Sequence, residues 1–140
     1  MSDETNQLRV RLVTPERTLF EHAAVTVELP AKNGYMEVLY GHAPLVAELG
    51  AGEVTLRGGP AGDEKYNVSW GFVEVLPDRV TILAADALKP GEIDVPRAQA
   101  QLDHGHKLWK DAGQSEEAYT EALRVIAEAE AKLATAAEKH

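Results

Sequence analysis

Apolar residues change their spacing once along this chain of 140 residues, and that change most constrains the fold. From Leu8 to about Leu88 they recur at every second position, the period of a β-strand with one buried face. After Lys89-Pro90-Gly91 they recur at spacings of three and four, the period of an amphipathic helix. The sequence therefore predicts an α+β chain, with a β domain at residues 1–88 and a helical domain at residues 89–140.

Turn-forming residues divide the first region into many short apolar runs. Glycine and proline interrupt the alternation at Pro30–Gly34, Gly50–Gly52, Gly58–Gly62 and Pro77-Asp78. Strands that follow one another about every 8–12 residues are typical of a sandwich or a barrel. Aromatic residues make up only 6% of the chain, so the core must be built mainly from Val, Leu, Ile and Ala.

Two helices are predicted in the second region. Asp94 is placed to cap the first helix, Pro96 is tolerated in its first turn, and the pattern runs to about Ala112. Gly113 suits the end of this helix, and Ser115 suits the cap of the next. Because the connection is so short, the helices are expected to form an antiparallel hairpin.

The apolar stripe of the second predicted helix is narrow and rich in alanine. Burying alanine gains little at roughly 25 cal/mol per Å², against an ordering cost of about 1–2 kcal/mol per residue. We therefore expect the hairpin to need a second surface to rest on. The stripe consists of Tyr119, Ala122, Leu123, Ile126, Leu133 and Ala137.

Composition excludes several classes of partner. The net charge of −9 opposes sequence-independent binding to phosphate backbones, so no nucleic acid is expected. The absence of cysteine excludes thiol catalysis, disulfides and thiolate metal sites. No apolar run approaches about 20 residues, and residues 1–6 are polar and acidic, unlike a secretory signal. Any association with a membrane is expected to go through a partner.

No catalytic or metal-binding motif is found. Ser69 lacks the first glycine of a Gly-x-Ser-x-Gly nucleophile elbow. His104 and His106 are two apart, which on a helix points them to different sides. The glycine-rich Gly58–Gly62 is followed by Asp63, which would repel phosphate. The chain is therefore predicted to have no catalytic and no metal site.

Four segments, in this order and spacing, resemble the epsilon subunits of F-type ATP synthases. They are Gly41-His42-Ala43-Pro44-Leu45, Gly52-Glu53-Val54, Trp70-Gly71-Phe72-Val73-Glu74-Val75 and Val80-Thr81-Ile82-Leu83-Ala84. The resemblance implies a ten-stranded β-sandwich that sits on the ring of c subunits and grips the gamma subunit, followed by an antiparallel two-helix hairpin. It also implies a non-catalytic rotor subunit that couples gamma to the c-ring during proton- or sodium-driven ATP synthesis.

The resemblance further implies that the hairpin can extend to the beta and alpha subunits of the catalytic head and restrain ATP hydrolysis. The location it implies is peripheral, at the cytoplasmic face of a bacterial inner membrane. Two rivals remain open. A free-standing adaptor or chaperone that presents a helical hairpin would be a monomer or homodimer without rotor partners, and a small hydrolase would depend on His42.

The loop that faces the c-ring in the family maps onto Gly34 through His42. Relatives more often carry glycine at the position of Glu37 and proline at that of Tyr40, so this chain departs from the pattern there. Tyr35 and Tyr40 are either amphipathic contacts on a partner or residues of a strand edge. The candidate contact residues are Gly34, Tyr35, Met36, Glu37, Tyr40 and His42.

The segment Ile93–Ala98 resembles a motif with which some relatives bind ATP. The resemblance makes Asp94 and Arg97 candidate ATP-binding residues, although Asp94 is also an ordinary helix cap. The arginine pair that accompanies the motif is replaced by Glu128 and Lys132, and Glu128 would oppose a phosphate. No cofactor is predicted other than this regulatory ATP.

Overall fold

The computed structural model describes residues 6–60 and 62–137. They fall into two compact units, Met1–Lys89 and Pro90–His140. The first unit contains only strands and turns apart from its first described residue, and the second contains only helices and their connections. Each unit is described by itself below.

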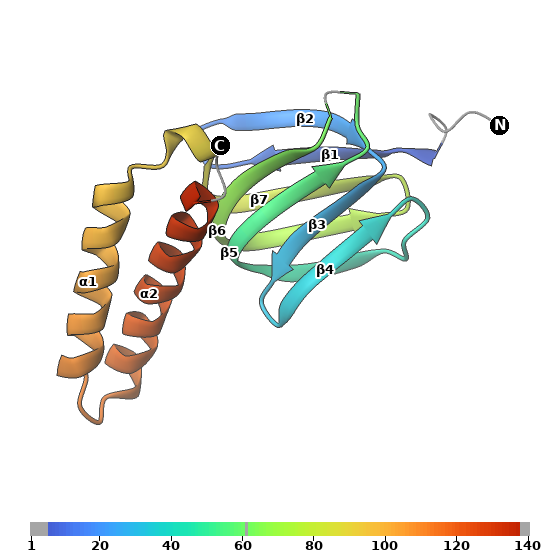
Figure 1. Cartoon of the computed structure of the whole chain (residues 1–140). Helices are drawn as coiled ribbons and strands as arrows, with labels where there is room; N and C mark the ends of the chain where they lie inside the picture. The colour runs from blue at the N-terminus through green and yellow to red at the C-terminus, as the bar shows by residue number, and fades with distance from the viewer. Residues whose placement is uncertain (1–5, 61, 138–140) are drawn as a thin grey trace. The chain divides into compact units, whose positions relative to one another are not determined.

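The β unit is one seven-stranded sheet in the order β2-β1-β7-β6-β5-β3-β4 (Figure 1). All neighbours are antiparallel except β1 and β7, which are parallel. The edge strands are therefore β2 and β4. The strands are β1 (Leu8–Val13), β2 (Thr18–Ala24), β3 (Thr26–Ala31), β4 (Gly34–Leu39), β5 (Leu45–Arg57), β6 (Glu64–Leu76) and β7 (Arg79–Leu88).

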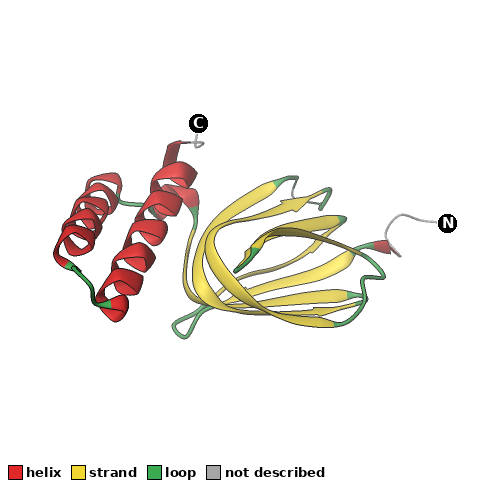
Figure 2. Cartoon of the chain, turned by 90° about the horizontal axis from the view of Figure 1, so that it is seen from below, coloured by secondary structure: helices red, strands yellow, loops and turns green. Residues whose placement is uncertain are grey.

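The resemblance implied ten strands, but the sandwich has seven, because three of its strands are long. β5 and β6 have 13 residues each and β7 has 10. The runs at 65–70 and 72–76, which the sequence pattern separates, are one strand in the structure. Figure 2 shows these strands curving around a shared interior, so a single folded sheet supplies both layers of the sandwich.

The long strands β6 and β7 each change the face that they bury, at neighbouring positions in the sheet. In β6 the buried apolar residues are the even-numbered Tyr66 and Val68 before the break and the odd-numbered Val73 and Val75 after it. Between them Trp70 and Gly71 have φ of 59° and 124°, which breaks the regular pleat. In β7 the buried positions change in the same way between Ala84 and Ala87. A strand that passes from one layer to the other needs such a break, and it looks like a strand boundary in the sequence.

Gly50–Gly52 is not a turn, as the sequence suggested, but an irregular stretch inside β5. The β3–β5 pairing is in register at Ala31 with Leu49 and at Glu28 with Thr55, so the longer interval in β5 bulges out of the ladder. Glycine is needed here because a Cβ on Gly52 would lie only 2.9 Å from Pro30 Cβ. The glycines mark a departure from the ladder without ending the strand.

The helical unit contains a short helix η2 (Pro90–Glu92) and two long helices, α1 (Val95–Asp111) and α2 (Glu116–Ala137). The predicted caps are present: Asp94 Oδ1 accepts the Arg97 N–H at 3.1 Å, and Ser115 Oγ accepts the Ala118 N–H at 3.2 Å. Among the described residues, no helix has both the length and the apolar character required to cross a bilayer.

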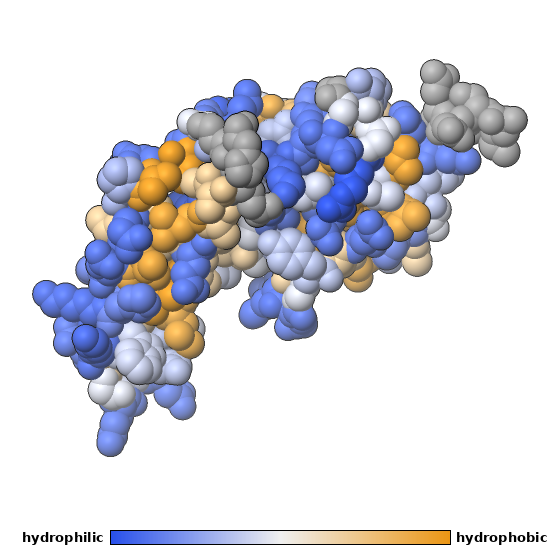
Figure 3. Space-filling model, in the orientation of Figure 1, coloured by the Kyte–Doolittle hydropathy of each residue, from blue (hydrophilic) through white to orange (hydrophobic). Residues whose placement is uncertain are grey.

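The two long helices pack along a thin seam. The Trp109 and Tyr119 rings lie 6.4 Å apart, and a Cβ on Gly105 would lie 2.7 Å from Ile126 Cγ1. These contacts run in reverse order along the chain, as in two helices that turn back on each other. Figure 3 shows apolar side chains gathered along the helices. The buried residues of this unit are small: Ala98, Gly105, Ala112, Ala122, Ala129 and Thr135.

Candidate functional site

The turn after β4 is held in place by backbone hydrogen bonds. The Gly41 N–H donates to Pro77 O at 2.7 Å, which ties the turn to the β6–β7 connection, and the His42 N–H donates to Leu39 O at 3.1 Å. Gly41 has a φ of 91°, a value that glycine adopts without strain. The end of the β unit therefore presents a fixed surface rather than a loose loop.

The candidate contact residues divide into exposed and packed ones. Tyr40 is 46% exposed, and Gly34 and Glu37 are also exposed. Met36 packs against the hydrophobic core, and His42 is half-buried. Tyr35 is 56% exposed, but its hydroxyl accepts a hydrogen bond from the Glu53 N–H at 2.9 Å.

Three exposed apolar residues that the sequence analysis did not select flank this turn in the chain. Leu39 precedes Tyr40 and is exposed, and Leu45 and Val46 follow the turn, with Val46 68% exposed. Adjacent apolar residues such as Leu39-Tyr40 and Leu45-Val46 break the alternation of a half-buried strand, because one of each pair must face water. That break was the available signal. We call Leu39, Tyr40, Leu45 and Val46 the end surface.

A second apolar surface lies on the outer side of β1, β6 and β7. Leu83 pairs in register with Phe72 on one side and with Val13 on the other, so the three side chains share a face. Phe72 and Leu83 are both about half exposed. Beside them is a hollow of about 360 Å³, lined by Val13, Thr14, Pro15, Gly71, Leu83, Ala84 and Ala85.

The residues considered for catalysis are not arranged for it. The side chain of Ser69 is fully buried in β6. The His42 Nδ1–H donates to Ala43 O at 2.7 Å, because a carbonyl oxygen can only accept. Within 6–60 and 62–137, no three His, Cys, Asp or Glu side chains lie close enough to hold a metal ion.

The candidate ATP-binding residues are engaged in helix structure. Asp94 caps α1 with its carboxylate, and Arg97 is exposed in the first turn. On α2, Lys132 Nζ lies 3.0 Å from Glu128 Oε1, and both side chains are largely buried. The lysine charge is therefore compensated by a carboxylate of its own helix.

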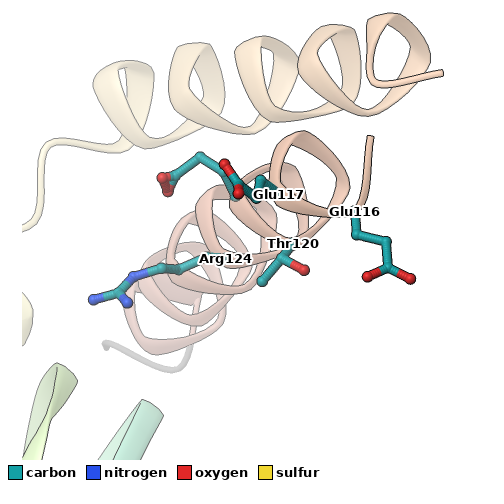
Figure 4. A pocket seen from close by; sticks show the side chains of 5 residues that line it. Glu116, Glu117, Thr120 and Arg124 are labelled. Atoms are coloured by element: carbon teal, nitrogen blue, oxygen red, sulfur yellow. The ribbon is translucent and has the colours of Figure 1, made fainter. Parts of the chain in front are cut away.

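Carboxylates also surround a hollow of about 510 Å³ on the first turns of α2 (Figure 4). Its walls carry Glu116, Glu117 and Glu121, with Arg124 as the only basic group among the lining residues. The excess of negative charge opposes a phosphate. This hollow is a solvated helix face.

One polar cluster in the β unit is more buried than this helix face. Tyr66 O–H donates to Glu64 Oε1 at 2.6 Å, and His22 Nδ1 lies 3.0 Å from Glu64 Oε2. The Tyr66 ring stacks on Phe20 with centroids 4.5 Å apart. Burial, and then the hydrogen bond and the charge of Glu64, raise the pKa of Tyr66 above its ordinary value. The cluster joins β2 to β6 by side chains alone.

These features define a two-part protein: a β-sandwich with exposed apolar surfaces and a pair of thinly packed helices. Residues 7–90 match the family described as ATP synthase, Delta/Epsilon chain, beta-sandwich domain. This chain belongs to the ATP synthase delta/epsilon family, as its sequence motifs suggested.

One curated relative covers nearly the whole chain. The chain is 40% identical over 133 residues to the ATP synthase epsilon chain of Solibacter usitatus (strain Ellin6076), covering 94% of this chain and 97% of the relative. It is 46% identical over 105 residues to the ATP synthase epsilon chain of Koribacter versatilis (strain Ellin345), covering 73% and 71%.

A solved structure has the same fold. A chain in the Euglena gracilis mitochondrial ATP synthase structure (OSCP/F1/c-ring) superposes with a TM-score of 0.76 at 21% identity. The match covers 95% of this chain and 82% of that chain. At this identity the likeness supports the arrangement of strands and helices, and the family rests on the closer relatives.

Proposed function

We propose that this chain is the epsilon subunit of a rotary ATP synthase, a central-stalk component that couples the gamma subunit to the c-ring. It catalyses no reaction itself. The β domain of residues 1–88 carries the coupling, and the helical domain of residues 89–140 carries the regulation. The location that follows is peripheral, at the cytoplasmic face of a bacterial inner membrane, through partners.

The end surface supports docking on the c-ring. Leu39, Tyr40, Leu45 and Val46 are apolar and exposed, yet the turn between them is fixed by the bond from Gly41 to Pro77. Apolar and aromatic side chains on a rigid frame lose little entropy on binding. Glu37 and His42 lie close to this surface in the chain and are the polar residues proposed for its rim. This fixed apolar end is the observation that carries the proposal.

The surface around Phe72 and Leu83 supports contact with gamma. It is separate in sequence from the end surface, so one partner can be lost without the other. A rotor subunit needs two such surfaces, because torque passes through it from the c-ring to gamma. An adaptor that works alone has no such requirement.

The test is co-purification from the native membrane in mild detergent. A tagged chain should recover gamma, the c subunits and the catalytic head, as identified by mass spectrometry. A Leu39→Ser, Tyr40→Ser variant should lose the c subunits and keep gamma, whereas Leu83→Glu should lose gamma. Tyr119→Ser is the matched control, since Tyr119 is 44% exposed and lies on the hairpin. Recovery of the tagged chain alone would favour the adaptor.

The ATP proposal for Asp94 and Arg97 is a weakly bound regulatory ligand. The carboxylate of Glu128 already satisfies Lys132, so a nucleotide phosphate would have to displace it. Calorimetric titration of the full chain with ATP should give weak heats that Arg97→Ala abolishes. Tight binding that survives Arg97→Ala would remove these residues from the site.

A further inference from the structure

The β5 bulge leaves backbone groups outside the β3–β5 ladder. Residues 50–54 of β5 have no partner in register on β3, between the pairs Ala31 with Leu49 and Glu28 with Thr55. Pro30, which lies in the same gap on β3, has no N–H to offer. A backbone donor in such a gap must find another acceptor or remain unpaired.

Tyr35 supplies that acceptor from a strand that is not adjacent to β5. Its register partner is Pro30 on β3, so its side chain must reach across β3 to the Glu53 N–H, 2.9 Å from the hydroxyl oxygen. A Cβ on Gly52 would collide with this hydroxyl, so glycine at that position makes the crossing possible. The ring stays more than half exposed although its hydroxyl is engaged.

The strand that carries Tyr35 also carries the docking surface. β4 is an edge strand of six residues, hydrogen-bonded in the sheet to β3, and it leads into the turn at Tyr40 and Gly41. The turn is fixed at its far end by the bond from Gly41 to Pro77. The bond from Glu53 to Tyr35 fixes the other end of β4, because Tyr35 is the second residue of the strand.

We propose that Tyr35 is a positioning residue, whose hydroxyl fastens edge strand β4 to β5 across β3 and so sets the orientation of the end surface. Its exposed ring is not itself the contact with the c-ring. The inference rests on the proposed function, since it assigns to Tyr35 a part in the same docking surface. A hydrogen bond of this kind holds a binding surface in one arrangement before the partner binds.

The test compares Tyr35→Phe with Tyr40→Phe in the full chain. Each change removes one hydroxyl and keeps the ring. Hydrogen exchange at the Glu53 amide and along β4 should accelerate about two- to tenfold in Tyr35→Phe, the factor that corresponds to one hydrogen bond, and should not change in Tyr40→Phe. Unchanged exchange at Glu53 would overturn the proposal.

Affinity separates positioning from stability and from direct contact. Rebinding to a rotor stripped of this subunit is measured well below the unfolding temperature, where every variant is folded and a loss of global stability alone changes nothing. Tyr35→Phe should bind several-fold more weakly, about as weakly as Tyr35→Ala. Wild-type binding by Tyr35→Phe with loss only in Tyr35→Ala would make the ring a contact and refute the positioning role. If Leu39→Ser, Tyr40→Ser also rebinds like wild type, the proposed function itself fails.

Discussion

The two units of this chain bury different kinds of side chain. The β unit encloses large aliphatic residues that are wholly shielded from water, whereas the helical unit buries alanine, glycine and threonine. Each additional buried methylene contributes about 0.8 kcal/mol, so a leucine core gains far more per residue than an alanine seam. The largest fully buried residues of the β unit include Leu8, Leu12, Leu29, Leu56 and Ile82.

The difference suits the coupling and the regulation that are proposed above for the two domains. A rigid domain can transmit force because its packing has one arrangement. Helices with a thin seam lose little when they leave one surface for another, so two states can lie within a few kcal/mol. The following experiments test this contrast, beginning with the largest expected effect.

Truncation of a leucine should be costly in the sandwich and cheap in the hairpin. Leu56→Ala, in the core, should lower the free energy of unfolding by about 2–5 kcal/mol. Leu123→Ala, at a half-exposed position of α2, should cost less than about 1 kcal/mol. Denaturant unfolding with separate strand and helix signals measures both. Equal costs would remove the contrast.

Two glycines with positive φ provide a second comparison. At Gly71, φ is 124° and a Cβ would collide with the Leu83 carbonyl oxygen of the neighbouring strand. At Gly113, φ is 58° and no atom lies within 4 Å of the added Cβ. Gly71→Ala should cost about 2–4 kcal/mol, and Gly113→Ala about 1 kcal/mol. The difference in thermal midpoint reports how tightly the corner of the sandwich is packed.

Loss of a helix cap should affect the hairpin alone. Asp94→Ala removes the acceptor of the Arg97 N–H and should cost about 1 kcal/mol, seen as faster hydrogen exchange in α1. Asp103→Ala, an exposed carboxylate of the same helix, is the matched control and should cost a few tenths of a kcal/mol at about the level of an i, i+4 pair. Faster exchange in the strands would show that the two units do not fold independently.

A pH effect is the smallest of the series and belongs to the sandwich. The pKa of Tyr66 is raised in the folded protein, so its contribution to stability is complete below its unfolded pKa of about 10 and is lost as the pH rises above that value. At about pH 10.5 the loss of stability should be about 1 kcal/mol, and it should be absent in Tyr66→Phe. Tyr40→Phe is the control, and the same alkaline loss in Tyr66→Phe would assign the effect to another group.

Local patterns in the sequence were sufficient for the two long helices and their caps. Asp94 and Ser115 cap helices as predicted, because a capping side chain contacts only residues nearby in sequence. The strand boundaries expected at Trp70-Gly71 and at Gly50–Gly52 were wrong, because a break inside a strand produces the same signal as a turn. The ten strands that the family resemblance implied are seven in the structure. Whether a strand ends or bends there depends on pairing with distant strands.

For the same reason, the sequence pattern indicated only part of the surface that is proposed above for docking. The turn of Gly41 and His42 was recognised from its residues, but its anchor at Pro77 lies far along the chain. The bond from Glu53 to Tyr35 crosses an intervening strand, so no local pattern contains it. Leu45 and Val46 resemble core residues until the strand that carries them is placed in the sheet.

The most direct test of this division of labour is to rebuild the synthase with a chain that ends at Leu88 and to measure proton-driven ATP synthesis and ATP hydrolysis on the same preparation. We predict that the truncated chain still assembles with gamma and the c-ring and supports synthesis, while hydrolysis rises because the restraining helices are gone. Loss of assembly would contradict the account. So would a truncated chain whose ATP hydrolysis, and whose activation of hydrolysis by ATP, equal those of the full chain.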